Sequence, residues 1–268
     1  MAISRSQLAK ELEPGLNALF GMEYSRYENQ HAEIFDTETS DRAFEEEVML
    51  SGFGAAPTKS EGGSIAFDDA QEAYTSRNNH ETVARGFSIT EEAVEDNLYD
   101  RLSSRYTRAL ARAMAHTKQV KAAAILNNAF NSSFKGGDGK ELCATDHPLT
   151  NGGTFANEPS TPADLNETSL EDALISIAGF TDERGLIIAL KGQKLIIPRQ
   201  LQFVAERLMV SNLRVGTADN DVNAIRSMGL LPEGYVVNDY LTDTDAFFIK
   251  TDAPNLSLIH ISEPTRRM

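Results

Sequence analysis

The chain has 268 residues, of which 41% are hydrophobic and 24% are charged, a composition typical of a globular protein that buries a core. Its formal net charge is −15, from 25 Lys and Arg against 40 Asp and Glu, which leaves no basic face of the kind that specific nucleic-acid binding needs. No apolar run reaches the roughly 18 residues of a membrane span, and Cys143 is the single cysteine, so we expect neither a membrane protein nor an internal disulfide.

Residues 1–61 are predicted to form an N-terminal arm and an entry loop. Four leucines at helical spacing are interrupted by Pro14 and Gly15, which predicts a short amphipathic helix followed by an extended arm. The stretch SGFGAAPTKSEGGS, at 51–64, is rich in Gly, Ser and Pro and therefore predicts a loop. The four leucines are Leu8, Leu12, Leu16 and Leu19.

Residues 62–89 are predicted to form an extended β-hairpin with little apolar surface, and the run Arg77-Asn78-Asn79-His80 supplies its turn residues. A lone two-stranded hairpin is marginally stable in water, so the pattern favours pairing with another molecule. A mobile surface hairpin is the alternative that the residues leave open. The side chains that we expect to make assembly contacts are Ile65, Phe67, Tyr74, Arg77, His80 and Phe87.

Residues 90–131 are predicted to form one long helix. Ser88 and Glu91 make a capping-box pattern, and neither Pro nor Gly occurs again before Gly136. At 1.5 Å per residue, a helix from Thr90 to about Phe130 would be roughly 60 Å long. Because its heptad register is loose, we expect it to lie across a broad sheet or a neighbouring subunit rather than in an isolated coiled coil. The residues expected on its apolar face are Val94, Leu98, Leu102, Tyr106, Ala109, Ala113, Val120 and Ala124.

Residues 132–255 are predicted to hold a long loop followed by mixed strands and helices, which makes the fold class α+β. Thr168 or Ser169 is expected to cap a helix that ends at about Phe180. The remaining expected elements are two buried strands in GLIIALKGQKLIIP split at Lys191-Gly192, an amphipathic helix in RQLQFVAERLMVS, and strands at Tyr235–Asn238 and Ala246–Lys250 with a turn at Thr242–Asp245 between them.

The one cluster that suggests chemistry is Cys143, Asp146 and His147 in LCATDHPL. A thiol beside an imidazole is a feature of nucleophilic catalysis, but catalytic Cys and His usually converge from distant segments, and Pro148 marks a turn here. One Cys and one His do not complete a zinc site. The glycines at 136–139 lack the Walker A spacing. We therefore predict no catalytic, cofactor or metal site and expect His147 to brace a loop.

Five stretches, in this order, resemble tailed-phage major capsid proteins, most closely the head subunits of Mu-like phages. The similarity extends from about residue 20 to Asn255. The stretches are EGGSIAFDDAQEAY, GFSITEEAVEDNLYDRL, ELCATDHPLTNGGTFAN, KLIIPRQLQFVAERLM and YVVNDYLTDTDAFFIKTDAPN.

The resemblance implies an α+β major capsid fold in which 62–89 is an extended loop that reaches over an adjacent subunit. By the same resemblance, 90–131 is the spine helix of a peripheral domain, and 132–255 forms the axial domain with the remainder of the peripheral domain. Copies would assemble as pentamers and hexamers into an icosahedral virion shell, in the cytoplasm of a bacterial host. Scaffold and portal proteins would be further partners, and DNA would be enclosed without specific binding, with no cofactor and no membrane.

Two alternatives to a phage head protein remain open from the residues. Encapsulin nanocompartments share the fold that the resemblance implies, but enclose an enzyme cargo. A hydrolase that uses Cys143 and His147 is the more distant alternative.

The C-terminal stretch 256–268, LSLIHISEPTRRM, differs in composition from the acidic chain before it. It resembles the translation of a transposon-end adapter used to fragment DNA for sequencing. We therefore expect a non-native tail on a truncated gene, with a genuine C-terminal strand as the alternative.

Overall fold

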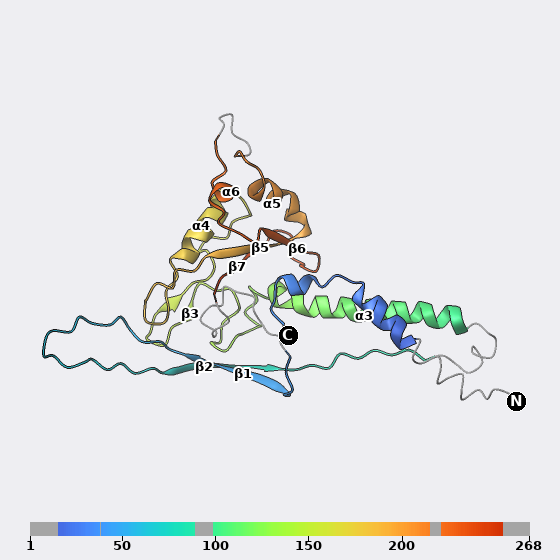
Figure 1. Cartoon of the computed structure of the whole chain (residues 1–268), viewed down its shortest axis with the longest axis horizontal. Helices are drawn as coiled ribbons and strands as arrows, with labels where there is room; N and C mark the ends of the chain where they lie inside the picture. The colour runs from blue at the N-terminus through green and yellow to red at the C-terminus, as the bar shows by residue number, and fades with distance from the viewer. Residues whose placement is uncertain (1–15, 38, 89–98, 215–220, 254–268) are drawn as a thin grey trace. The chain divides into compact units, whose positions relative to one another are not determined.

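The computed structural model describes residues 16–37, 39–88, 99–214 and 221–253. Contacts divide the chain into two compact units (Figure 1). Unit 1 contains Met1–Gln30 and Glu81–Ala122, and unit 2 contains His31–His80 and Ala123–Met268. Strands and helices both occur, so the α+β prediction is confirmed.

Unit 1 is built from a helix at 16–25 and most of the long helix α3 (Tyr99–Asn127), whose last residues belong to unit 2. The short helix confirms the part of the predicted amphipathic helix that follows the Pro–Gly break, and α3 confirms the long helix over the described residues. Predicted positions 1–15 and 90–98 lie outside the described residues.

The buried face of α3 is not the predicted one. Tyr106 is 51% exposed and Val120 is 42% exposed, so two of the largest residues of the predicted face are open to solvent. The face that is buried carries small or polar side chains, and Gln119 Nε2 donates to the carbonyl of Glu28 at 3.2 Å. Small side chains allow close approach of another segment, which the alanine-rich sequence permits on more than one face. In the part of α3 that belongs to unit 1, the buried residues are Ser103, Thr107, Ala111, Ala115, Gln119 and Ala122.

Unit 2 contains an antiparallel hairpin formed by β1 (Phe44–Leu50) and β2 (Glu72–Asn79). The expected hairpin at 62–89 is therefore wrong in its strands, because the partner of β2 precedes the glycine-rich loop. The expected turn is wrong too, since Arg77 pairs with Glu46 in the ladder and Asn79 pairs with Phe44. β1 was not predicted as a strand because it contains three consecutive glutamates, and glutamate is depleted in strands. The turn residues of the sequence do not indicate where this strand lies.

A three-stranded sheet of order β6-β5-β7 forms the centre of unit 2. The middle strand β5 (Gly192–Pro198) is parallel to β6 (Tyr235–Asn238) and antiparallel to β7 (Phe248–Thr251). Leu195, Ile196 and Ile197 are fully buried, so both faces of β5 are covered, as the continuous apolar run predicted. The two late strands are confirmed, the first with its predicted bounds.

Helices cover one face of this sheet, with α4 (Glu167–Ala178), η2 (Arg199–Leu201), α5 (Gln202–Met209) and α6 (Ala224–Met228) contributing to one apolar cluster. The predicted helix after Pro198 is confirmed. The helix cap is corrected: Asn166 accepts from the Ser169 backbone at 2.9 Å, and the Ser169 hydroxyl accepts from the Asn166 backbone at 3.0 Å. The expected strand before Lys191 is absent, because Thr181 and Ile187 form only an isolated bridge.

The opposite face of the sheet is closed by aromatic and N-terminal residues of the same unit. Ile196 pairs with Phe248 in the ladder, and the ring of Phe248 stacks on that of Phe130 at 5.8 Å. Ile34 and Phe35, after the short helix η1 (Gln30–Glu33), are also fully buried, and Lys194 Nζ donates to the carbonyl of Glu33 at 3.0 Å. The core of unit 2 is thus complete on both sides of β5.

Candidate assembly surface

The hairpin continues beyond its strands as two arms that lie side by side and lead away from the β5 sheet (Figure 1). The arms comprise residues 51–71 and are joined across by hydrogen bonds. Ser51 N donates to the carbonyl of Gln71 at 2.8 Å, and Gly54 N donates to Asp68 Oδ2 at 2.8 Å. The bond from Gly54, with the Arg184 guanidinium nearby, lowers the pKa of Asp68. We call residues 51–71 the extended loop.

Beyond Gly54 and Asp68 the extended loop reverses at a tight turn. Gly63 N donates to the carbonyl of Ser60 at 3.0 Å, and Gly62 has a φ of 77°, a conformation that favours glycine. The glycine-rich loop predicted at this place is therefore the tip of the hairpin rather than the entry to it.

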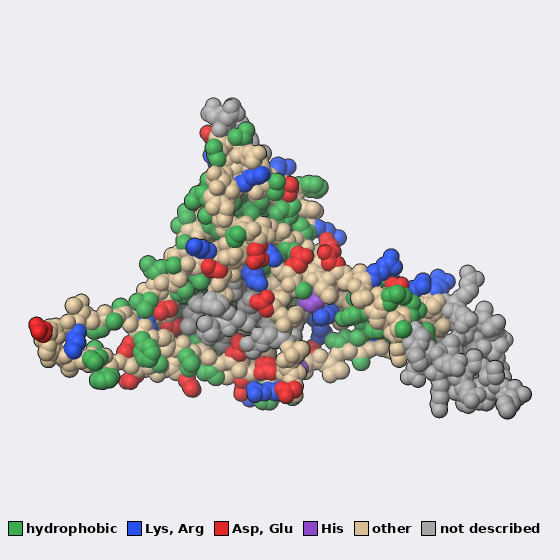
Figure 2. Space-filling view, in the orientation of Figure 1, with side chains coloured by type: hydrophobic (Ala, Val, Ile, Leu, Met, Phe, Trp, Pro, Cys, Tyr) green, Lys and Arg blue, Asp and Glu red, His purple; other side chains and the backbone are tan. Residues whose placement is uncertain are grey.

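Apolar side chains on the extended loop are open to solvent. Phe67 is 94% exposed, Ile65 is 67% exposed and Phe53 is 60% exposed, whereas Ser51 is the single buried residue of the loop. Figure 2 shows hydrophobic side chains spread along this part of the chain between charged ones. Water contact with these groups is unfavourable, so the loop is suited to burial against another surface.

Unit 2 holds the hairpin at its base through strand β2. Tyr74 Oη donates to the carbonyl of Pro148 at 3.1 Å, and burial raises the pKa of Tyr74, which keeps the phenol protonated. Gly137 lies so close to β2 that a Cβ there would be 3.0 Å from the carbonyl oxygen of Thr75. The strands are thus attached to the loop that contains His147, while the arms project beyond it.

The loop that contains His147 is closed by a buried polar cluster. His147 Nδ1 lies 2.6 Å from Asp138 Oδ2, and Nε2 lies 3.3 Å from Asn157 Oδ1. Burial alone would raise the pKa of Asp138, but hydrogen bonds from His147 and from the Lys140 backbone outweigh it and lower that pKa. The predicted bracing role of His147 is confirmed by these contacts.

Cys143 lies in the same loop without the environment of a nucleophile. Burial, together with the nearby Glu158 carboxylate, raises the pKa of the thiol to about 12. The thiolate is the reactive form of cysteine, and it is scarce at neutral pH with such a pKa. Within the described residues, no group of three His, Cys, Asp or Glu side chains is placed to hold a metal ion.

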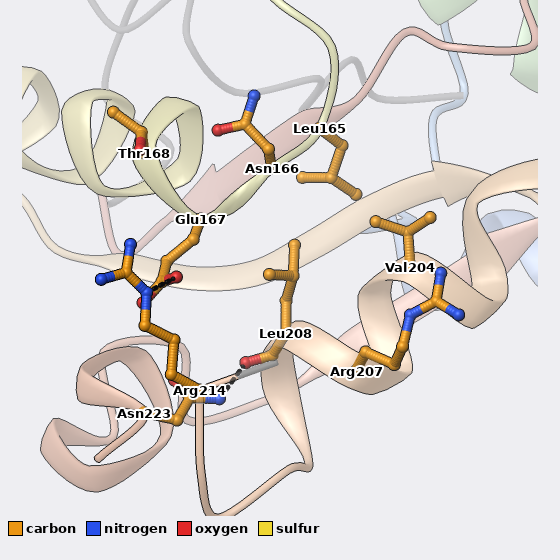
Figure 3. A pocket seen from close by; sticks show the side chains of 9 residues that line it. All are labelled: Leu165, Asn166, Glu167, Thr168, Val204, Arg207, Leu208, Arg214 and Asn223. Carbon is orange, nitrogen blue, oxygen red and sulfur yellow. Dashed lines mark hydrogen bonds and ion pairs between the residues drawn. The ribbon is translucent and has the colours of Figure 1, made fainter. Parts of the chain in front are cut away.

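A hollow of about 330 Å³ lies between the start of α4 and helix α5 (Figure 3). Arg214 Nε contacts Glu167 Oε2 at 2.6 Å on its wall, and Asn223 Nδ2 donates to the carbonyl of Leu208 at 2.7 Å. Arg214, Glu167 and Asn223 are thus already engaged in bonds within unit 2. The lining residues are Leu165, Asn166, Glu167, Thr168, Val204, Arg207, Leu208, Arg214 and Asn223.

Comparison with known proteins decides the family. The sequence pattern of the family described as phage capsid protein matches residues 72–265. The chain belongs to the phage capsid protein family. It is a major capsid protein of the tailed-phage type, a structural subunit of the head shell. None of the curated proteins compared with this capsid protein matches it.

Solved capsid structures share its fold at low sequence identity. The bacteriophage JBD30 capsid superposes with a TM-score of 0.61 at 12% identity, covering 81% of this chain and 92% of that chain. The JBD30 procapsid superposes with a TM-score of 0.58 at 14% identity, covering 89% of this chain and 100% of that chain. The family favours neither the encapsulin-like shell nor the hydrolase.

The residues predicted to make assembly contacts are dispersed in this capsid protein. Ile65 and Phe67 lie on the extended loop, whereas Tyr74 and Arg77 lie on β2, where Arg77 pairs with Glu46 and its guanidinium lies 4.4 Å from the ring centroid of Phe44. His80 follows β2 and is exposed. Phe87 is in unit 1, where its ring lies 5.8 Å from that of Tyr106. Their assembly role stays a prediction.

Other exposed apolar residues lie outside that predicted set. Phe53 on the other arm of the loop was missed because its neighbours are small and polar, although an aromatic residue in such a segment is itself a signal.

The C-terminal residues 254–268 lie outside the described part, and so does the stretch that resembles an adapter. Among the described helices, none is both long and apolar enough to cross a membrane.

Proposed function

We propose that this capsid protein self-assembles through its extended loop, which covers part of a second copy in the shell. The exposure of Phe67 carries the proposal: a residue 94% open to solvent, beside the Gly54–Asp68 bond that joins the two arms, has no partner surface within the loop. Burying such a side chain contributes about 1.5–3 kcal/mol, which repeated contacts around a closed shell multiply.

The small size of the hairpin sheet supports contact between copies as well. Among the described residues the β1–β2 ladder has two strands, and a two-stranded sheet gains stability when a third element packs on it.

A pair of variants tests the role of the loop. In Phe67→Ser the apolar group is lost, whereas Phe67→Leu keeps it, and neither affects the core of unit 2 because the residue is exposed. Sedimentation velocity should show that Phe67→Ser shifts self-association to at least about tenfold higher concentration, while Phe67→Leu stays near the parent. Equal association of both variants would show that the loop does not take part.

We propose further properties that are more specific than membership of the phage capsid protein family. The subunit acts as a structural protein without catalysis, which the protonated Cys143 thiol and the engaged His147 ring support. We also infer pentamers and hexamers, assembly in the bacterial cytoplasm, and scaffold and portal partners, on the strength of the resemblance. The net charge of −15 supports enclosure of DNA without binding, so DNA should not be retained on the purified subunit.

A further inference from the structure

A tight turn in unit 2, between Thr181 and Ile187, contacts the root of the extended loop. Asp182 Oδ1 accepts from the backbone of Arg184 at 2.9 Å and from that of Leu186 at 2.8 Å. Gly185 has a φ of 80°, and Thr181 and Ile187 bridge the two sides. Hydrogen bonds within the turn therefore fix its backbone conformation. This fixes the position of the Arg184 Cα, from which the side chain extends.

The same turn is fixed to the body of unit 2 by a buried carboxylate. Glu183 is 4% exposed, and its Oε2 accepts from both the backbone and the hydroxyl of Thr150 at 2.7 Å. Asn151 Nδ2 donates to the carbonyl of Glu183 at 3.1 Å. Charge-assisted bonds of this kind are stronger than neutral ones, so the turn is a rigid support.

From this support the Arg184 guanidinium reaches both arms of the extended loop. Nε donates to the carbonyl of Gly52 at 3.1 Å on one arm, and an Nη nitrogen donates to the carbonyl of Asp69 at 2.7 Å on the other. The same nitrogen lies 3.7 Å from Asp68 Oδ1. The Arg184 side chain is 19% exposed, so these bonds are partly shielded from water.

We propose that Arg184 is a positioning residue for assembly, which fixes the direction in which the extended loop leaves unit 2. This inference rests on the proposed role of that loop. The arms have one buried residue and no core, so bonds at their root decide where the tip lies. A guanidinium holds its donors in a rigid planar fork, so it bridges two carbonyls in a fixed geometry, whereas the three donors of a lysine ammonium rotate on a flexible stem and fix no such geometry. A loop held in advance loses less entropy when it binds a neighbour.

A spectroscopic measurement tests this on the unassembled full chain. Cys143, the single cysteine, is replaced by Ala, and spin labels are placed at Ser60→Cys on the tip and Ser227→Cys on α6, both exposed positions of unit 2. Pulsed electron resonance then gives the distribution of distances between the labels. We expect Arg184→Ala to broaden this distribution at least twofold and Arg184→Lys to give an intermediate width.

Arg214→Ala is the matched control, since Arg214 also contacts a carboxylate in unit 2 but lies at the α4–α5 hollow. It should leave the width unchanged. A merely structural role of Arg184 would lower the melting temperature without widening the distribution, and that result would overturn the inference. Circular dichroism of Arg184→Lys checks that this variant keeps the secondary structure of the parent.

Association is measured on the same proteins by sedimentation. Arg184→Ala should associate at least about tenfold more weakly than the parent, with Arg184→Lys between them. A broad distribution with unchanged association would overturn the role of Arg184 in assembly, whereas the role of the loop itself is decided by Phe67→Ser. If Phe67→Ser weakens association while Arg184→Ala changes neither width nor association, the loop keeps its proposed function and Arg184 is not its positioning residue.

Discussion

At position 147 a histidine joins two segments of a long loop. Its ring contacts Asp138 in the turn before it and Asn157 after β4 (Thr154–Phe155), while its backbone belongs to β3 (His147–Pro148). Asn157 also accepts from the Ala144 backbone at 2.8 Å and donates to the carbonyl of Leu142 at 2.8 Å. The cluster supports the same loop that contacts β2, so these side chains act on the base of the hairpin.

Replacing His147 with Ala should destabilise the subunit by about 1–3 kcal/mol, because the buried Asp138 carboxylate is left without its closest partner. The measurement is urea unfolding of the unassembled chain. His80→Ala is the control: His80 is exposed, and its replacement should change the free energy of unfolding by less than about 0.5 kcal/mol. Equal effects of the two variants would show that the cluster does not stabilise the loop.

The buried Cys143 thiol should make the free energy of unfolding depend on pH in a predictable direction. Its pKa in the folded chain, about 12, is above the ordinary value of 9.0, so the folded state holds the proton more tightly. The thiol's contribution to stability is therefore complete below pH 9 and is lost as the pH rises toward 12. The difference in unfolding free energy between the parent and Cys143→Ala should shrink across this range. A difference that stays constant with pH would contradict this account.

Among the elements, α4 offers a direct test of the observed cap. Asn166→Ala removes the bond to the Ser169 backbone and should lower the free energy of unfolding by about 1 kcal/mol. Thr168→Ala, at one of the two positions expected from the sequence to cap the helix, should change it by less than about 0.5 kcal/mol because Thr168 is exposed. Thermal or urea unfolding distinguishes them, and a larger effect for Thr168 would refute the assignment.

The elements differ in how far the sequence predicts them. β6 follows from a short apolar run, and α5 from helical spacing, because each pattern is contained in its own residues. The partner of β2 could not be found that way, since pairing between residues 44–50 and 72–79 crosses a long loop. The buried face of α3 was missed because alanines occur around the helix and large residues were given more weight than small ones. Arg184 was missed because its partners are backbone carbonyls far away in sequence.

At the scale of the whole molecule, unit 2 buries its own core, whereas the extended loop has no core of its own. The sheet around β5 is covered on both faces within the subunit. The extended loop instead exposes aromatic and aliphatic side chains on arms fixed at their root by Arg184. We therefore expect a subunit with these two parts to fold around its own core, and we propose that it buries the apolar surface of the extended loop against a second copy.

The most direct test of this account is to find what Phe67 touches when copies associate. The residue is replaced by the photo-crosslinking analogue benzoylphenylalanine, and associated chains are irradiated and separated by denaturing electrophoresis. We predict a product of twice the chain mass, in which mass spectrometry places the link between residue 67 and another copy, and no such product at concentrations where the chain is unassociated. Links confined to single chains, in samples that have associated, would contradict the claim that the extended loop binds a neighbouring subunit.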